Sequence, residues 1–146
     1  MDHNDIINRI AELLDSIEWS YNNSEEKDRL YLSLQSTQTG LSSNIQIRAF
    51  DDGWYRIYAT WPDDIDTDID MNPIIEYVAN SAVSDYNYDL LKVSTEDGVI
   101  YYVSFVYVND ISELTDEIID ATITGTALRI AEKYGPDTMD IISEQE

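Results

Sequence analysis

The amino-acid sequence predicts an α+β protein in which helices pack on an antiparallel sheet. In three segments apolar residues recur every three or four positions, which is the period of an amphipathic helix. In other segments apolar and polar residues alternate, as in half-buried strands, and Gly53 and Gly98 each follow an aspartate at a predicted hairpin turn. The predicted order of elements is α-β-β-β-α-β-β-α.

The first half of the chain is expected to hold one helix and three antiparallel strands. The helix extends from Asn4 to Trp19, and the strands cover residues 30–34, 44–49 and 54–61, with Pro62 ending the third. The side chains expected to form the buried face of this helix are Ile6, Ile10, Leu13 and Ile17, with Ile7 and Leu14 beside them.

A second helix is predicted to begin at Asn72 and Pro73, because asparagine is a favoured N-cap and proline a favoured first helical residue. It is expected to end near Asn87, and two strands, 90–94 and 99–108, follow it. The apolar residues expected on its buried face are Ile75, Val78, Ala82 and Tyr86.

A third helix is predicted to begin near Asp110, whose spacing to Glu113 fits a capping box, and to stop at Gly135 and Pro136. Together these elements form one predicted domain, residues 1–136, followed by an acidic C-terminal tail, residues 137–146. The residues of the third helix expected in the core are Leu114, Ile118, Ile123, Ala127, Ile130 and Tyr134.

The charge of the chain is far from balanced. Thirty acidic residues face eight basic ones, so the formal net charge is -22. This charge disfavours direct binding to nucleic acid or to an anionic membrane surface, and it predicts a partner that is basic or partly apolar. Three explanations of the acidity stay open: adaptation of a halophilic source to high salt, a merely solvated acidic surface, or imitation of the phosphate backbone of a nucleic acid.

Two features bear on the compartment. The chain has no cysteine, which excludes disulfides and thiolate chemistry. Its first five residues, 1–5, are acidic where a secretory signal would be basic, and no apolar run approaches the roughly 18 residues that cross a bilayer. We expect a cytoplasmic protein that does not enter a membrane.

The element order resembles that of the YbjN family and of the wider type III secretion chaperone-like fold. The residues that carry the resemblance are the helix start at Asn72-Pro73, the turn at Asp97-Gly98 and the segment Ile111-Ser112-Glu113-Leu114. The resemblance implies a curved antiparallel sheet packed on helices, frequent homodimerisation and the binding of a protein or peptide segment. It brings no catalytic residues with it.

Carboxylates at alternate positions make the segment Asp63–Asp70 a candidate for a hard cation such as calcium. The candidate ligands are Asp64, Asp66, Asp68 and Asp70. The segment does not match an EF-hand, because isoleucine occupies the positions that need glycine and the bidentate glutamate. The alternative is a solvated acidic loop whose last aspartate interacts with the amino end of the second helix.

The residue pattern gives little support for a catalytic function. The single histidine, His3, lies near the amino terminus, where a Ser-His-Asp arrangement would need an ordered chain end. The five glycines stand apart and do not form a phosphate-binding loop, so no nucleotide cofactor is expected. We therefore expect a non-enzymatic protein without a cofactor.

Aromatic residues are concentrated in two of the predicted strands. Side chains along a strand point alternately to its two faces, so one set should face the helices and the other should lie on a second surface. Tyrosine and tryptophan are favoured where such a surface binds a protein partner. The candidate partner-binding residues are Trp54, Tyr55, Tyr58 and Trp61 on one strand and Tyr101, Tyr102, Phe105 and Tyr107 on the other.

These observations predict a chaperone-like or adaptor protein that binds a protein or peptide partner, and a homodimer. Two alternatives remain. The first is an acidic nucleic-acid mimic that inhibits a DNA- or RNA-binding enzyme through its carboxylates. The second is a calcium-binding module built on the segment Asp63–Asp70.

Overall fold

The computed structural model describes residues 2–26, 28–66, 68–81 and 89–145. The predicted α+β class and element order are confirmed, with one short additional strand and some added helical turns. The elements are α1 (His3–Ser16), β1 (Asn22–Asn23), β2 (Arg29–Gln35), β3 (Ser42–Ala49), β4 (Trp54–Thr60), α2 (Asn72–Ser81), β5 (Asp89–Ser94), β6 (Val99–Tyr107), a 3-10 turn (Ile111–Glu113), α3 (Asp116–Leu128), a π-helical turn (Arg129–Tyr134) and α4 (Gly135–Ser143).

The six strands form one antiparallel sheet in the order β1-β2-β3-β4-β6-β5. Both predicted Asp-Gly turns have glycine at positive φ, +93° at Gly53 and +70° at Gly98. Gly98 is required for a second reason, because a Cβ there would overlap the backbone of Ile65. The Ile65 amide donates to the Gly98 carbonyl at 2.6 Å, so this turn anchors the loop that follows β4.

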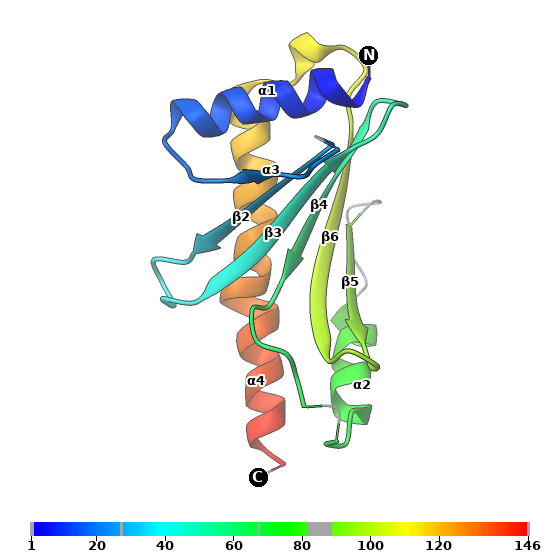
Figure 1. The fold of residues 1–146 in the computed structure, drawn as a ribbon. Coiled ribbons are helices and arrows are strands. Elements are labelled where there is room, and N and C mark those ends of the chain that lie inside the picture. Colours follow the sequence, from blue (N-terminus) through cyan, green and yellow to red (C-terminus); the bar gives the residue numbers. More distant parts are fainter. Residues whose placement is uncertain (1, 27, 67, 82–88, 146) are drawn as a thin grey trace.

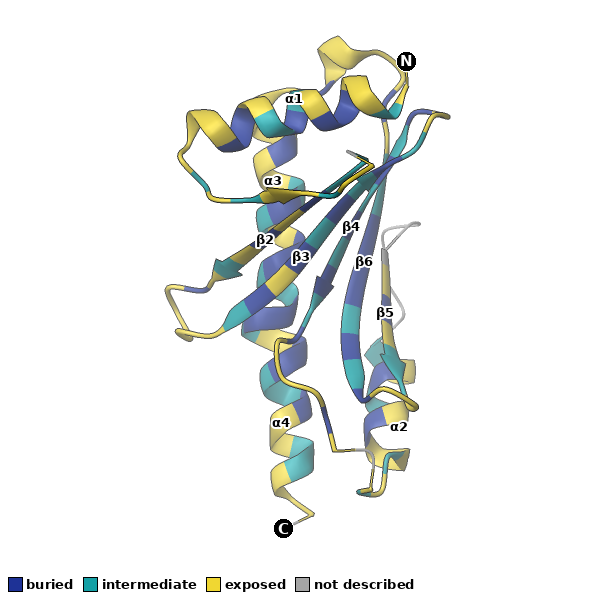
Figure 2. Ribbon diagram, viewed as in Figure 1, coloured by how far each residue is buried: buried dark blue, intermediate teal, exposed yellow. Residues whose placement is uncertain are grey.

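The helices cover one face of the sheet, and the core lies between them and the strands (Figure 1). Alternate residues of β3 and β4 are buried, as Figure 2 shows, so the period-two patterns in these strands are confirmed. One hydrophobic cluster joins α1 and α3 to β2, β3 and β4. A second joins α2 and the C-terminal helical residues to β4, β5 and β6.

The predicted end of the third helix at Gly135 and Pro136 is wrong. The chain continues from α3 through the π-helical turn into α4, and Figure 1 shows one long rod beside the sheet. Pro136 has no N–H to donate in the first turn of α4, and the carbonyl of Ala131 accepts a hydrogen bond of 3.2 Å from the Thr39 hydroxyl instead. Gly135 has no Cβ, and a Cβ there would overlap the ring of Trp61.

The predicted start of that helix is also corrected. Asp110 caps the 3-10 turn by accepting from the Ser112 amide at 2.9 Å, and α3 begins later, after the N-cap Thr115. The shift changes which side chain points inward, since Ile119 is fully buried and Ile118 is 43% exposed. The predicted core residues Leu114, Ile123, Ala127, Ile130 and Tyr134 are buried.

Smaller corrections concern the other two helices. In α2 the buried isoleucine is Ile74, whereas the predicted Ile75 is exposed; Val78 is buried as expected. The predicted end of this helix, with Ala82 and Tyr86, lies outside the described residues. In α1 the predicted core residue Ile17 follows the last helical turn and is exposed, while the predicted core residues Ile6, Ile7, Ile10, Leu13 and Leu14 are buried.

Residues of the predicted acidic tail are helical and contact the body of the protein. The Asp137 carboxylate accepts a hydrogen bond of 2.6 Å from the Tyr77 hydroxyl, which ties α4 to α2. Gln145 bonds the backbone of Asp70 through both its amide nitrogen and its amide oxygen. Within the described ranges, no helix is both long and apolar enough to span a bilayer.

Candidate functional site

The face of the sheet opposite the helices is the candidate functional site, and we name it the open face. Its side chains alternate along each strand with the core residues, and the pairing of the strands sets them in rows across the sheet. Its principal residues are Arg29 and Tyr31 of β2, Gln46 and Arg48 of β3, Phe50 just after β3, Trp54, Arg56 and Tyr58 of β4, and Tyr101, Val103, Phe105 and Tyr107 of β6.

Three arginines lie in one row across three neighbouring strands. Arg29 is directly opposite Arg48, and Arg48 is directly opposite Arg56. We name these three residues the arginine row. Like charges placed directly opposite each other in a sheet are destabilising. The row therefore concentrates positive charge on one face of a protein with a net charge of -22.

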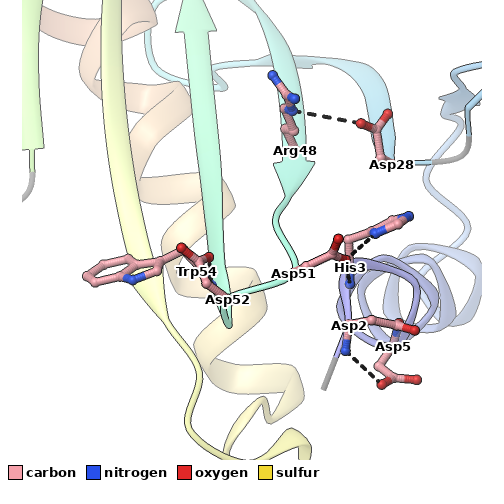
Figure 3. A network of polar contacts seen from close by, with 8 residues as sticks. All are labelled: Asp2, His3, Asp5, Asp28, Arg48, Asp51, Asp52 and Trp54. Carbon is pink, nitrogen blue, oxygen red and sulfur yellow. Dashed lines mark hydrogen bonds and ion pairs between the residues drawn. The ribbon is translucent and has the colours of Figure 1, made fainter.

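One carboxylate lies beside two of these arginines. Asp28 is 3.6 Å from the Arg29 Nε and 3.8 Å from the Arg48 Nε, and Figure 3 shows its ion pair with Arg48. Arg56 instead donates to the amide oxygen of Gln46 at 3.1 Å. Burial lowers the pKa of Arg56, and repulsion from Arg48 and then Arg29 lowers it further. The positive charges of the row thus act on one another.

The strands that build this face exclude carboxylates. The segments β2, β3, β4 and β6 contain no aspartate or glutamate, although the chain has 30 such residues. Lys92 of β5 is exposed and lies directly opposite Tyr101 on the same face of the sheet. Except for Asp89 of β5, the acidic residues that the structure describes lie in helices, turns and loops, and the four central strands contain none.

Aromatic side chains flank the arginine row. On one side Trp54 and Tyr107 are opposite each other, with ring centroids 5.2 Å apart. On the other side the Tyr58 and Tyr101 rings stack at 4.8 Å. These contacts hold the rings side by side, which presents an aromatic surface on both sides of the positive charge.

Arginines of the row also contact rings directly. The Arg48 guanidinium carbon lies 4.8 Å from the Phe50 ring centroid, and that of Arg56 lies 5.9 Å from it. Arg56 also lies 6.0 Å from the Tyr58 centroid. Cation–π contacts of this kind fix the planes of the guanidinium groups without neutralising their charge.

The structure divides the eight predicted partner-binding aromatics between the two faces. Tyr55, Trp61 and Tyr102 face the helices and are buried, so they belong to the core and cannot contact a partner. The Tyr55 hydroxyl is 3.2 Å from the Thr122 hydroxyl of α3, and burial raises the pKa of Tyr55. The other five lie on the open face: Trp54, Tyr58, Tyr101, Phe105 and Tyr107.

The predicted calcium ligands do not converge. Asp66 accepts from the backbone amide of Asp68, and Asp70 accepts from that of Asn72, so both carboxylates serve the local turn. The other two candidates, Asp64 and Asp68, are exposed. Within the described part of the chain, no three acidic or histidine side chains are grouped to hold a metal ion.

His3 is held at the start of α1 by the turn before β4. Its Nδ1 lies 2.5 Å from the Asp51 carboxylate, and its backbone amide donates to the same oxygen at 3.1 Å (Figure 3). The hydrogen bond to Asp51 raises the pKa of His3 and lowers that of Asp51. The contact ties the first helix to the sheet.

The alignment of the three arginines in one row was not predicted from the sequence. Arg48 and Arg56 each occupy a polar position in an alternating segment, which by itself indicates only a half-buried strand. A signal was nevertheless present, because long segments without a single carboxylate are conspicuous in so acidic a chain. Only the pairing of strands, however, places Arg29 in line with the other two.

Comparison with known proteins identifies no family for this chain. No family model matches the sequence, and no curated protein matches it. Among solved structures, the chain is similar to YbjN from E. coli, a candidate transcription regulator, at 10% sequence identity and a TM-score of 0.45. The match covers 84% of this chain and 94% of that one. A likeness at this level concerns the arrangement of the elements and does not extend to function.

Proposed function

We propose that the protein is a non-enzymatic binding protein, chaperone-like or adaptor in type, that holds a segment of a partner protein on the open face. The observation that carries the proposal is the group of five aromatic side chains on a sheet face that the helices leave uncovered. Tyr107 is 53% exposed and Tyr31, beside the group, 37%. Aromatic rings that are gathered on one surface and partly exposed are typical of protein interaction sites.

The arrangement suits binding because its parts are rigid. The rings are carried by central strands and contact one another across β4 and β6, so little side-chain entropy is lost when a partner covers them. Arginine is also enriched in protein interfaces, and three arginines lie within the same surface.

A selection from a random dodecapeptide library against the immobilised protein tests the proposal. We expect selected peptides to lose at least about tenfold in affinity for Tyr58→Ser and Trp54→Ser, because a buried ring at the centre of an interface contributes that much or more. Ile118→Ser is the control, since Ile118 is an apolar residue of α3 that is 43% exposed and lies outside the open face. Peptides that bind both open-face variants as tightly as the wild type would refute the proposal.

A homodimer is proposed as well, whose contact lies either on the open face or elsewhere on the surface. Light scattering on the wild type and on Tyr58→Ser measures this directly. A dimer that dissociates in Tyr58→Ser and persists in Ile118→Ser would place self-association on the open face. A wild type that is monomeric at micromolar concentration would contradict a homodimer.

A further inference from the structure

We propose that the partner segment held on the open face is acidic, with aspartate or glutamate side chains that bind the arginine row. This inference rests on the proposed function and names the chemistry of the partner. It also departs from the expectation of a basic partner, which the net charge of the whole chain suggested. The binding surface and the rest of the molecule have opposite charge.

The arginine row contains more positive charge than its surroundings neutralise. Among the residues that the structure describes, the row's ion pairs involve one carboxylate, Asp28, which lies beside Arg29 and Arg48. Arg56 donates a hydrogen bond to the neutral amide of Gln46. An incoming carboxylate would relieve the repulsion between opposed arginines, so the face is complementary to an anion.

The guanidinium groups of the row are accessible and oriented. The side chains of Arg29 and Arg48 are 30% and 34% exposed, so part of each remains open to a ligand. The Nε atoms of Arg29, Arg48 and Arg56 are buried and donate no hydrogen bond, which leaves the terminal guanidinium nitrogens as the available donors. A planar pair of such donors matches the two oxygens of a carboxylate.

Aromatic residues are the neighbours of the row. Alternate residues of a strand leave the backbone about 7 Å apart on the same face, so the aromatic residues before and after Arg56 on β4 flank it on both sides. Trp54 and Tyr107 lie on one side, and Tyr58 and Tyr101 on the other. A protein segment with acidic residues between apolar or aromatic ones fits this alternation.

A protein segment is favoured over two other anionic occupants. A nucleic acid longer than a few nucleotides would extend beyond the row and meet the acidic surface that surrounds the sheet, where the field of a molecule with charge -22 opposes it. A second copy of the chain would bring the same large negative charge with it. A short acidic segment carries only the two or three charges that the row can neutralise.

Three fluorescent probes test the inference by anisotropy at 0.05 M and 0.3 M potassium chloride. The first is a decapeptide in which glutamate alternates with tyrosine, and the second has glutamine at every glutamate position. The third is a ten-nucleotide oligothymidylate. We expect the glutamate peptide to bind the wild type at least about tenfold more tightly than the glutamine peptide, and the difference to shrink at the higher salt concentration.

Arg56→Gln is the decisive variant, because its side chain has no ion pair among the described contacts and its loss should leave the fold intact. It should remove most of the preference for glutamate while leaving the affinity for the glutamine peptide unchanged. Arg9→Gln is the matched control, since Arg9 pairs with Asp116 on the helical side of the molecule and carries the same charge change. Arg48→Lys is a second variant that keeps the charge and removes the planar donor pair.

The outcomes separate the inference from the proposed function. Equal binding of both peptides, lost in Tyr58→Ser, would overturn the acidic partner and leave the binding surface in place. Binding of neither peptide together with an unproductive library selection would overturn both. Tighter binding of oligothymidylate than of the glutamate peptide would overturn the inference in favour of a nucleic acid, and a salt-dependent dimer that Arg56→Gln dissociates would overturn it in favour of a second copy.

Discussion

The two faces of the sheet come from the same strands and differ in almost every physical property. On the helix-covered face, residues such as Ile47, Ile57 and Ile100 are at most 1% exposed and fill two hydrophobic clusters. On the open face, the alternate residues are arginines and aromatic rings that remain half-exposed. One face stabilises the fold, whereas the other contains opposed like charges that work against it.

The difference between the two faces shows that the acidic residues are not distributed evenly over the protein. A uniformly acidic surface would be expected of salt adaptation alone, since added carboxylates would be distributed over every exposed face. Here the four central strands contain none. We infer that a separate requirement shapes the open face, and the proposed binding of an acidic segment supplies one.

The largest contrast between the faces should appear in stability. Ile57→Ala removes a fully buried side chain between the sheet and α3, and we expect it to lower the free energy of unfolding by about 2–5 kcal/mol. Thr60→Ala, on the same strand but on the open face, should change it by less than about 0.5 kcal/mol. Urea denaturation of both variants measures the two values, and equal losses would remove the distinction between the faces.

A second test concerns the tightest contact on the covered side. Gly135→Ala introduces a Cβ into the ring of Trp61, and we expect a loss of about 1–3 kcal/mol from overpacking. Gly125→Ala is the control, because a Cβ there meets nothing within 4 Å and should stabilise the helix by roughly 0.5–1 kcal/mol. If Gly135→Ala left the free energy of unfolding unchanged, the helical rod and Trp61 would be able to move apart without loss of stability.

A third test asks how much the polar contact between α2 and α4 contributes to stability on the covered side. Tyr77→Phe removes the 2.6 Å hydrogen bond to Asp137, and we expect a loss of about 1 kcal/mol. Tyr21→Phe removes a similar bond to Asp15 at an exposed site and should cost less. Burial, followed by the bond to Asp137, raises the pKa of Tyr77, so alkaline difference spectra should show Tyr77 as a late-ionising tyrosine.

The smallest expected effect is the pH dependence of the contact between α1 and the turn that precedes β4. Because the pKa of His3 is raised in the folded state, its contribution is fully present below its ordinary value of 6.5 and is lost as pH rises through the folded value. The pKa of Asp51 is lowered, so its contribution is present above its ordinary value of 3.8 and is lost as pH falls through the folded value.

The melting temperature of the wild type minus that of His3→Ala should therefore be greatest between these two limits and vanish toward pH 9. Asp51→Asn should show the same loss of pH dependence, since either change removes the contact. A difference that stays constant from pH 5 to pH 9 would show that the histidine does not titrate through this ion pair.

The elements that are set by local residue patterns could be predicted from the sequence alone. The strand positions, the two Asp-Gly turns and the buried face of α1 followed from period and turn residues, because burial on one side imposes those periods on any sheet or helix. The start of α3 was placed too early because Asp110 is a good cap for two kinds of turn, and the sequence does not distinguish a 3-10 turn from the first turn of an α-helix.

Only the tertiary structure decided the rest. Gly135 and Pro136 form a stop signal by themselves, yet the chain continues as a helix because Trp61 and α2 give that segment a surface to contact. The sequence does not show which of the eight aromatic residues belong to the core and which to the open face. The three arginines of the row are far apart along the chain. Pairing of β2, β3 and β4 in one register aligns those arginines, because strand register is set by contacts between residues distant in sequence.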